Sequence, residues 1–187
     1  LGDGATTATG VGQVTQPAGT ISATTLNVRS TSGGVTLDRS TNALTSLGSI
    51  VTTGGGFTYV DNDGLTMGAS GSIDTTKAAS AGGAVSITAG GALALRDITT
   101  SGTTSGVGGD VTLVTSAGGI TTASGTTITT SGAGGNNNAG TVIFRSNDTA
   151  VGLSGSITAT GAGTGTGTVT LGDGATTATG VGQVTQP

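Results

Sequence analysis

The side chains that most often carry out acid–base catalysis or bind transition metals are absent from this sequence. The 187 residues include no His, Cys or Glu, and those types supply most general acids, general bases and zinc ligands. A serine–lysine dyad would have to use Lys77, the single lysine, with Ser72 or Ser80 close by. We interpret Lys77 as a solvated surface residue, because nothing else around it suggests a nucleophile.

Aspartates are the remaining candidates for chemistry. Asp61 and Asp63 could form a carboxylate pair of the kind that cleaves polysaccharides, and Asp97 stands beside Arg96. Such a site also needs a cleft and aromatic platforms for sugar rings, yet the chain has only two Phe and one Tyr. We therefore predict that the chain is not an enzyme.

The run Asp61-Asn62-Asp63-Gly64 resembles part of a calcium-binding loop, because carboxylates and a turn glycine suit that hard cation. It lacks the preceding Asp and the downstream Glu of the helix–loop–helix pattern. We treat Asp61 and Asp63 as a weak calcium candidate and favour a plain turn. No Gly-Lys-Ser/Thr follows the glycines, so no phosphate loop and no cofactor are predicted.

The composition favours β-structure with a thin core. The chain has 39 Gly and 42 Thr, and charged residues make up only 7%. Threonine suits strands and glycine suits tight turns, whereas good helix formers are scarce. The net charge is −4 and the five basic residues are dispersed, which argues against nucleic acid as a partner. No apolar run approaches ~20 residues, so we expect no membrane span in this segment.

A long exact repeat organises the chain. Residues 1–17 and 171–187 both read LGDGATTATGVGQVTQP, at an offset of 170. Self-similarity at a fixed period is typical of repeat architectures. We expect residues 1–170 to be one solenoid unit and residues 171–187 to begin the next tandem copy.

Inside the unit, a small-residue turn followed by alternating apolar residues recurs, as in Gly109-Asp110-Val111-Thr112-Leu113. The phrase Ile128-Thr129-Thr130-Ser131-Gly132 and its relatives lie between these alternating segments. The first apolar residues of the segments act as anchors and are unevenly spaced: Val35, Phe57, Val85, Val111, Val142 and Val169. The longest gap separates Val169 from the equivalent of Val35 in the next copy. The residues expected to line the core are Val35, Leu37, Phe57, Tyr59, Val85, Ile87, Val111, Leu113, Ile120, Ile128, Val142, Phe144, Val169 and Leu171.

Alternation places one set of side chains on one face of each strand, and repetition favours stacked coils over a sandwich or barrel. Parallel strands ~4.8 Å apart would give each unit a length of roughly 30 Å. We predict an all-β parallel β-helix, or β-solenoid, with six or seven coils per repeat. The seventh coil would come from the longest gap between anchors, where Ile21, Leu26 and Val28 could line it.

The phrases Gly83-Ala84-Val85-Ser86-Ile87-Thr88-Ala89-Gly90-Gly91 and Gly109-Asp110-Val111-Thr112-Leu113 resemble those of filamentous-haemagglutinin-type proteins. The run Thr25-Leu26-Asn27-Val28 before Gly34-Val35-Thr36-Leu37 is similar to that family too. The resemblance covers essentially the whole chain. It implies a right-handed parallel β-helix, secretion to a bacterial cell surface, and a role in adhesion, biofilm or surface filaments. It supplies no catalytic motif.

We therefore expect a structural or adhesive fibre segment whose partners are the neighbouring tandem repeats of the same chain. Sister fibres, surface glycans and host or neighbouring cells are further candidate partners. A glycan- or host-binding module is the alternative, with Phe57 and Tyr59 beside Asp61 as its best local feature. An ice-binding face is a further alternative. It would use Thr-x-Thr pairs such as Thr127/Thr129, but these do not recur at one phase in the sequence.

Overall fold

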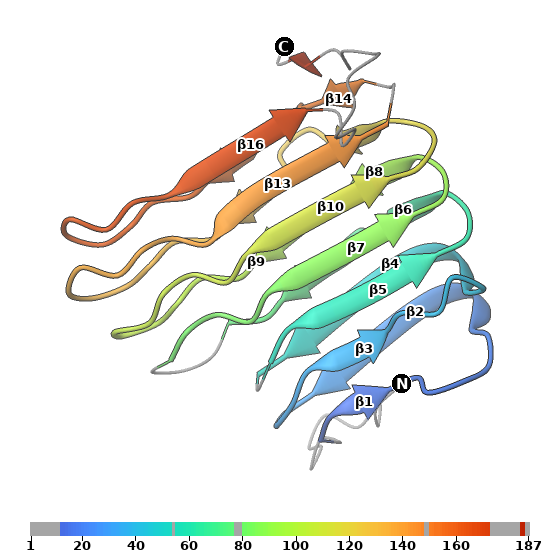
Figure 1. Cartoon of the computed structure of the whole chain (residues 1–187), viewed down its shortest axis with the longest axis horizontal. Helices are drawn as coiled ribbons and strands as arrows, with labels where there is room; N and C mark the ends of the chain where they lie inside the picture. The colour runs from blue at the N-terminus through green and yellow to red at the C-terminus, as the bar shows by residue number, and fades with distance from the viewer. Residues whose placement is uncertain (1–11, 54, 77–79, 148–149, 173–183, 186–187) are drawn as a thin grey trace.

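The computed structural model describes residues 12–53, 55–76, 80–147, 150–172 and 184–185, and these contain strands and turns but no helix. Every strand pairing is parallel. Figure 1 shows the strands stacked as the rungs of one rod, with the chain winding from one sheet to the other at each level. The prediction of an all-β parallel solenoid is confirmed.

Sheet A is a single file of seven strands, one from each level of the stack. Its first two strands are the shortest, and the later ones are longer. In order they are β1 (Val14–Thr15), β3 (Val35–Leu37), β5 (Phe57–Asp61), β7 (Val85–Ala89), β10 (Val111–Thr115), β13 (Thr141–Ser146) and β16 (Thr168–Gly172).

Sheet B contains the other ten strands. Three long strands, with register shifts in their pairing, form its lower levels: β2 (Ser22–Ser30), β4 (Ala43–Thr52) and β6 (Leu65–Asp74). Above β6 each level is split into two short strands, because β6 pairs with both β8 and β9. These are β8 (Leu93–Leu95) with β9 (Asp97–Thr99), β11 (Ile120–Thr122) with β12 (Thr127–Thr129), and β14 (Val151–Gly152) with β15 (Ser156–Thr158); β17 (Val184–Thr185) pairs with β14.

The core is a set of columns that run along the rod. In sheet A, Val85, Val111 and Val142 are register partners on successive strands, and all three are buried. Each buried aliphatic side chain contributes on the order of 1.5–3 kcal/mol relative to an exposed one. A single coil encloses little volume, so most of this burial arises between levels. Stability therefore depends on stacking.

Twelve of the fourteen residues expected to line the core are buried. The other two lie on β16, the last strand of sheet A. Val169 is 43% exposed and Leu171 is partly buried against the core. Both continue inward columns, as partners of Val142 and Phe144, so their exposure is along the rod axis, beyond the top of the sheet.

A buried ladder of hydroxyl groups joins sheet B to sheet A on five consecutive levels. Each hydroxyl donates to the carbonyl oxygen of a glycine that leads into the next strand of sheet A, and each of these Ser or Thr residues is fully buried. The pairs are Ser30 with Gly33, Thr52 with Gly55, Thr75 with Gly83, Thr100 with Gly109, and Thr130 with Gly140. Buried polar groups require such partners.

Glycine is needed at these turns because the coils approach closely there. A Cβ on Gly83 would clash with the carbonyl oxygen of Gly55, and a Cβ on Gly109 would clash with that of Gly83. The same relation holds between Gly140 and Gly109. The glycine carbonyl that accepts the buried hydroxyl thus also sets how closely the next level can pack.

Long loops close the coils between sheet B and sheet A, and Figure 1 shows those before β10, β13 and β16 projecting together from one side. They also pair with one another. Asn136 Oδ1 accepts the Thr164 N–H at 3.2 Å, and Asn138 Oδ1 accepts the Thr166 N–H at 3.0 Å. The asparagine-rich loop therefore extends the stacking beyond the sheets.

Candidate functional site

The Asp61 carboxylate lies inside the solenoid, because alternation along β5 turns Phe57, Tyr59 and Asp61 inward. Its Oδ2 accepts the Tyr59 hydroxyl at 2.6 Å and the Leu44 N–H at 2.9 Å. Its Oδ1 accepts the Asp63 N–H at 2.9 Å. The carboxylate therefore fastens the turn after β5 to the start of β4.

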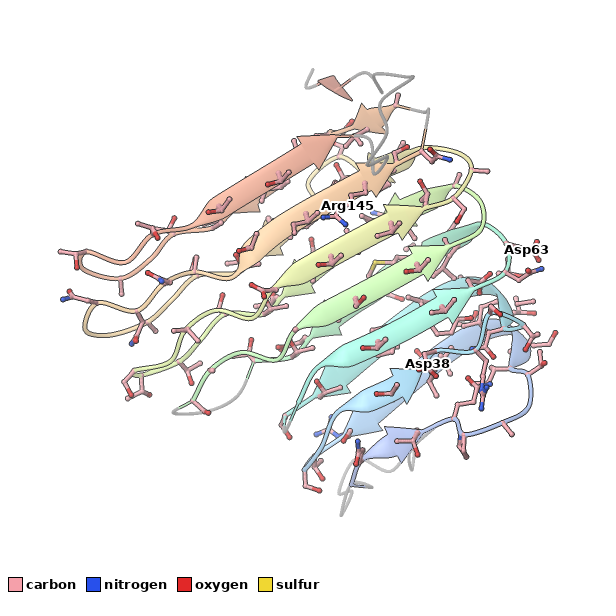
Figure 2. The ribbon with its side chains drawn as sticks, in the orientation of Figure 1. Asp38, Asp63 and Arg145 are labelled. Carbon is pink, nitrogen blue, oxygen red and sulfur yellow. The ribbon has the colours of Figure 1, made fainter. Side chains whose placement is uncertain are left out.

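Asp63 lies on the outside of that turn and is exposed, and Figure 2 shows it at the edge of the molecule. The turn thus separates the two carboxylates that the sequence suggested as calcium ligands, one inside and one outside. Asp61 already uses both oxygens as hydrogen-bond acceptors. In the described part of the chain, no three His, Cys, Asp or Glu side chains lie together as a metal site would require.

Phe57 and Tyr59 form a stacked aromatic contact, with ring centroids 6.3 Å apart and planes inclined by 6°. Both side chains are buried. Burial, together with the hydrogen bond to Asp61 and its charge, raises the pKa of Tyr59 above the ordinary range of a tyrosine. Because the rings fill the core, they offer no surface on which a sugar could stack.

Other aspartates join neighbouring coils. Asp97 Oδ1 accepts the Thr127 N–H at 2.8 Å, from the level above. Asp110 Oδ1 accepts the Thr141 N–H at 2.8 Å, also from the level above. In both pairs an exposed carboxylate accepts the N–H of the first residue of the strand above. Asp97 and Asp110 therefore contribute to the stacking of successive coils.

One shallow groove lies where β6 bulges and the sheet splits, with a volume of about 290 Å³. Arg96 and Asp97 contribute its charged groups, and Ser70, Ser72 and Ser124 contribute hydroxyls. Ser72, a candidate serine of the serine–lysine dyad, therefore lines a groove that contains an arginine. Lys77 itself lies outside the described residues, and Ser80 follows it at the start of the next described stretch.

The outer face of sheet A carries a column of hydroxyl groups at one fixed phase. Its members are consecutive register partners, and one of the seven positions is an isoleucine: Thr15, Thr36, Thr58, Ser86, Thr112, Ile143 and Thr170. The column consists of single hydroxyl residues and is distinct from the Thr-x-Thr pairs that the sequence suggested for an ice-binding face. The register aligns the members of the column across coils of unequal length, of which Val14 to Val35 is the shortest and Val111 to Val142 the longest.

Charge on this face is sparse. Figure 2 shows Arg145 on the outward face of β13 and Asp38 several strands away, next to β3. Both are exposed. Between them, the second outward column consists of Val60, Thr88 and Val114. The face is therefore flat, hydroxyl-rich and almost neutral.

The sequence matches no family model, no curated protein and no solved structure. Among the residues that the structure describes, no helix has the length and hydropathy to cross a bilayer.

The buried hydroxyl ladder is the feature that sequence reasoning missed. As a strand former, Thr is expected at outward positions. Yet Ile98 and Thr100 are two apart, as are Ile128 and Thr130, so an inward Ile requires an inward Thr. The recurring Ile-x-Thr phrase therefore contained the signal, and a glycine further along the chain accepts each Thr hydroxyl.

Proposed function

We propose that this chain is a structural fibre segment of a giant, secreted, surface-exposed bacterial repeat protein. Its task in this proposal is mechanical: it sets the length and stiffness of a stalk or filament. The observation that carries the proposal is the unbroken register of sheet A, in which one inward column runs from Val14 to Val169 and a second from Leu37 to Leu171.

The distribution of polar groups supports a scaffold. The five hydroxyls of the buried ladder, Asp61, Asp97 and Asp110 are engaged in hydrogen bonds between or within coils. In repeat proteins, the free energy of unfolding is approximately a sum of terms for each unit and for each interface between neighbouring units. Adding copies therefore does not destabilise the stack. The repeated 17-residue sequence supports the presence of further copies.

The cell-surface location and the adhesive role rest on the resemblance to filamentous-haemagglutinin-type proteins, and so do the right-handed winding and the contribution to biofilm. A parallel solenoid is compatible with that family. Adhesion would then occur through faces such as the flat exterior of sheet A, towards sister fibres, glycans or host cells.

Chains with one, two and four copies of the repeat unit test the proposal. X-ray scattering and electron microscopy should show rods of constant width whose length increases in proportion to copy number. Compact particles, or flexible strings of separate beads, would reject a length-setting role. Binding of bacteria displaying these chains to glycan-coated and bare surfaces would test adhesion separately.

A further inference from the structure

The same two residues of the repeat pair in two different sheets. Val14 and Thr15 form β1, which pairs with β3 in sheet A. Their exact counterparts in the second copy of the repeated sequence, Val184 and Thr185, form β17, which pairs with β14 in sheet B. Because the two segments have identical sequences, their different positions must come from what lies next to them in the stack.

Where two copies of the repeat meet, the length of the coil decides which segment of the second copy can pair with β16 in sheet A. The shortest step between register partners on successive strands of sheet A joins Val14 to Val35. If Val184 stacked directly on Val169, a complete turn would have to close between those two residues. That stretch of chain is shorter than the shortest turn observed, and each turn must cross sheet A, sheet B and both connections. Residues 184–185 therefore cannot form the next strand of sheet A.

The next candidate for that position is β3 of the following copy. Its sequence, Val35-Thr36-Leu37, is the same as Val169-Thr170-Leu171 at the centre of β16. Stacked in register, valine would cover valine and leucine would cover leucine, which would bury the 43% of Val169 that is exposed here. β1 offers Val14, Thr15 and Gln16 at these places, so the leucine column would meet an amide instead.

We propose that the free edge of β3 is the docking surface for β16 of the preceding copy, and that β1 covers this edge only where no copy precedes it. This inference rests on the proposed function. It gives each repeat six levels of sheet A, or ~29 Å of rod, whereas an additional β1 level would give ~34 Å. β1 is then a removable cover for the edge of β3, because an uncovered strand edge can pair with other chains.

Polar contacts of Gln16 stabilise the pairing of β1 with β3 when no copy precedes the repeat. The Gln16 amide donates to Asn42 Oδ1 at 2.7 Å, and the Asn42 amide donates to Gln16 Oε1 at 2.9 Å. The Gln16 N–H also donates to the Thr36 carbonyl at 3.0 Å. When β16 replaces β1, Asn42 keeps its bonds to the Ile21 N–H and the Leu37 carbonyl. The exchange gives up this amide pair and the bonds from Ser30 Oγ to the Gly12 carbonyl and from Arg39 Nε to the Gln16 carbonyl, and it closes two apolar columns.

The test uses a chain of two copies, residues 1–170 followed by residues 1–187, which has no native cysteine. The junction pair combines Thr170→Cys in the first copy with Thr36→Cys in the second. The cover pair combines Thr15→Cys and Thr36→Cys, both in the second copy. The same cover pair in the 187-residue chain is the reference. All three sites face outward, so nitroxide labels there do not disturb the core.

Spin labels on adjacent strands, whose backbones lie ~4.8 Å apart, broaden each other's spectra strongly. We expect broadening for the reference pair and the junction pair, and loss of broadening for the cover pair in the two-copy chain. A broadened cover pair without a broadened junction pair would overturn the inference, as would two unbroadened pairs. X-ray scattering of the same samples separates the two proposals: a rod with the wrong pair broadened rejects only this inference, whereas a compact particle also rejects the fibre.

Discussion

Replacing Thr100 with valine tests the buried hydroxyl ladder. Thr100 is fully buried, and its hydroxyl donates to the Gly109 carbonyl at 2.5 Å. Valine occupies nearly the same volume, so no cavity forms, and the backbone bond from the Gly109 N–H to the Thr100 carbonyl remains. The substitution removes one hydrogen bond and leaves a buried acceptor, which costs about 1–3 kcal/mol.

Urea unfolding followed by far-UV circular dichroism measures this loss. With a denaturant slope of about 2 kcal/mol per molar, the midpoint should decrease by roughly 0.5–1.5 M. Thr112→Val is the matched control, because Thr112 lies on the outer face of sheet A, and its free energy of unfolding should change by no more than about 0.5 kcal/mol. Equal midpoints for Thr100→Val and Thr112→Val would refute the role of the ladder.

Three further results are expected. Gly109→Ala should destabilise the chain by about 1–3 kcal/mol, because the added methyl clashes with the Gly83 carbonyl. Gly68→Ala, with only an ordinary contact at 3.8 Å, should change urea stability little, and equal effects would count against close coil packing. Tyr59 should show no phenolate absorbance in the folded chain near pH 10, because its pKa is raised. Because the folded state favours the protonated phenol, the contribution of Tyr59 to the free energy of unfolding is complete below about pH 10 and decreases at higher pH. Phenolate formation without unfolding would contradict the burial of Tyr59. Val111→Asp places a charge in a fully buried column and should abolish cooperative unfolding by urea, whereas an unchanged transition would show that Val111 does not face the core.

The fold could be predicted because two simple regularities agree. Alternation at sites such as Val111-Thr112-Leu113 defines an inward face, and the recurrence of that pattern defines a stack. Both depend on local sequence. The burial of Val85, Val111 and Val142 in one column follows from them directly.

The candidate sites could not be predicted as well, because their geometry depends on which face each residue occupies. Asp61 and Asp63 are two positions apart, and simple alternation would place both on one side. The strand ends at Asp61, however, and the turn carries Asp63 to the outside. Likewise, Phe57 and Tyr59 suggest a sugar platform by residue type, although their alternation with Thr58 places them in the core.

The outer hydroxyl column and the proposed pairing of β16 with β3 of the next copy both depend on the register between coils of unequal length. Insertions in the loops change the sequence spacing between partners such as Ser86 and Thr112 without changing their alignment. A sequence scan at constant period therefore misses the column. Strand pairing supplies the alignment directly.

Fibre diffraction from aligned tandem copies tests the central claim most directly, because that claim is that coils stack in parallel register along the rod. We predict a strong ~4.8 Å reflection on the meridian, parallel to the rod axis, as stacked strands require. A ~4.8 Å reflection on the equator would mean that the strands run along the axis, as in a chain of sandwiches, and would contradict the solenoid.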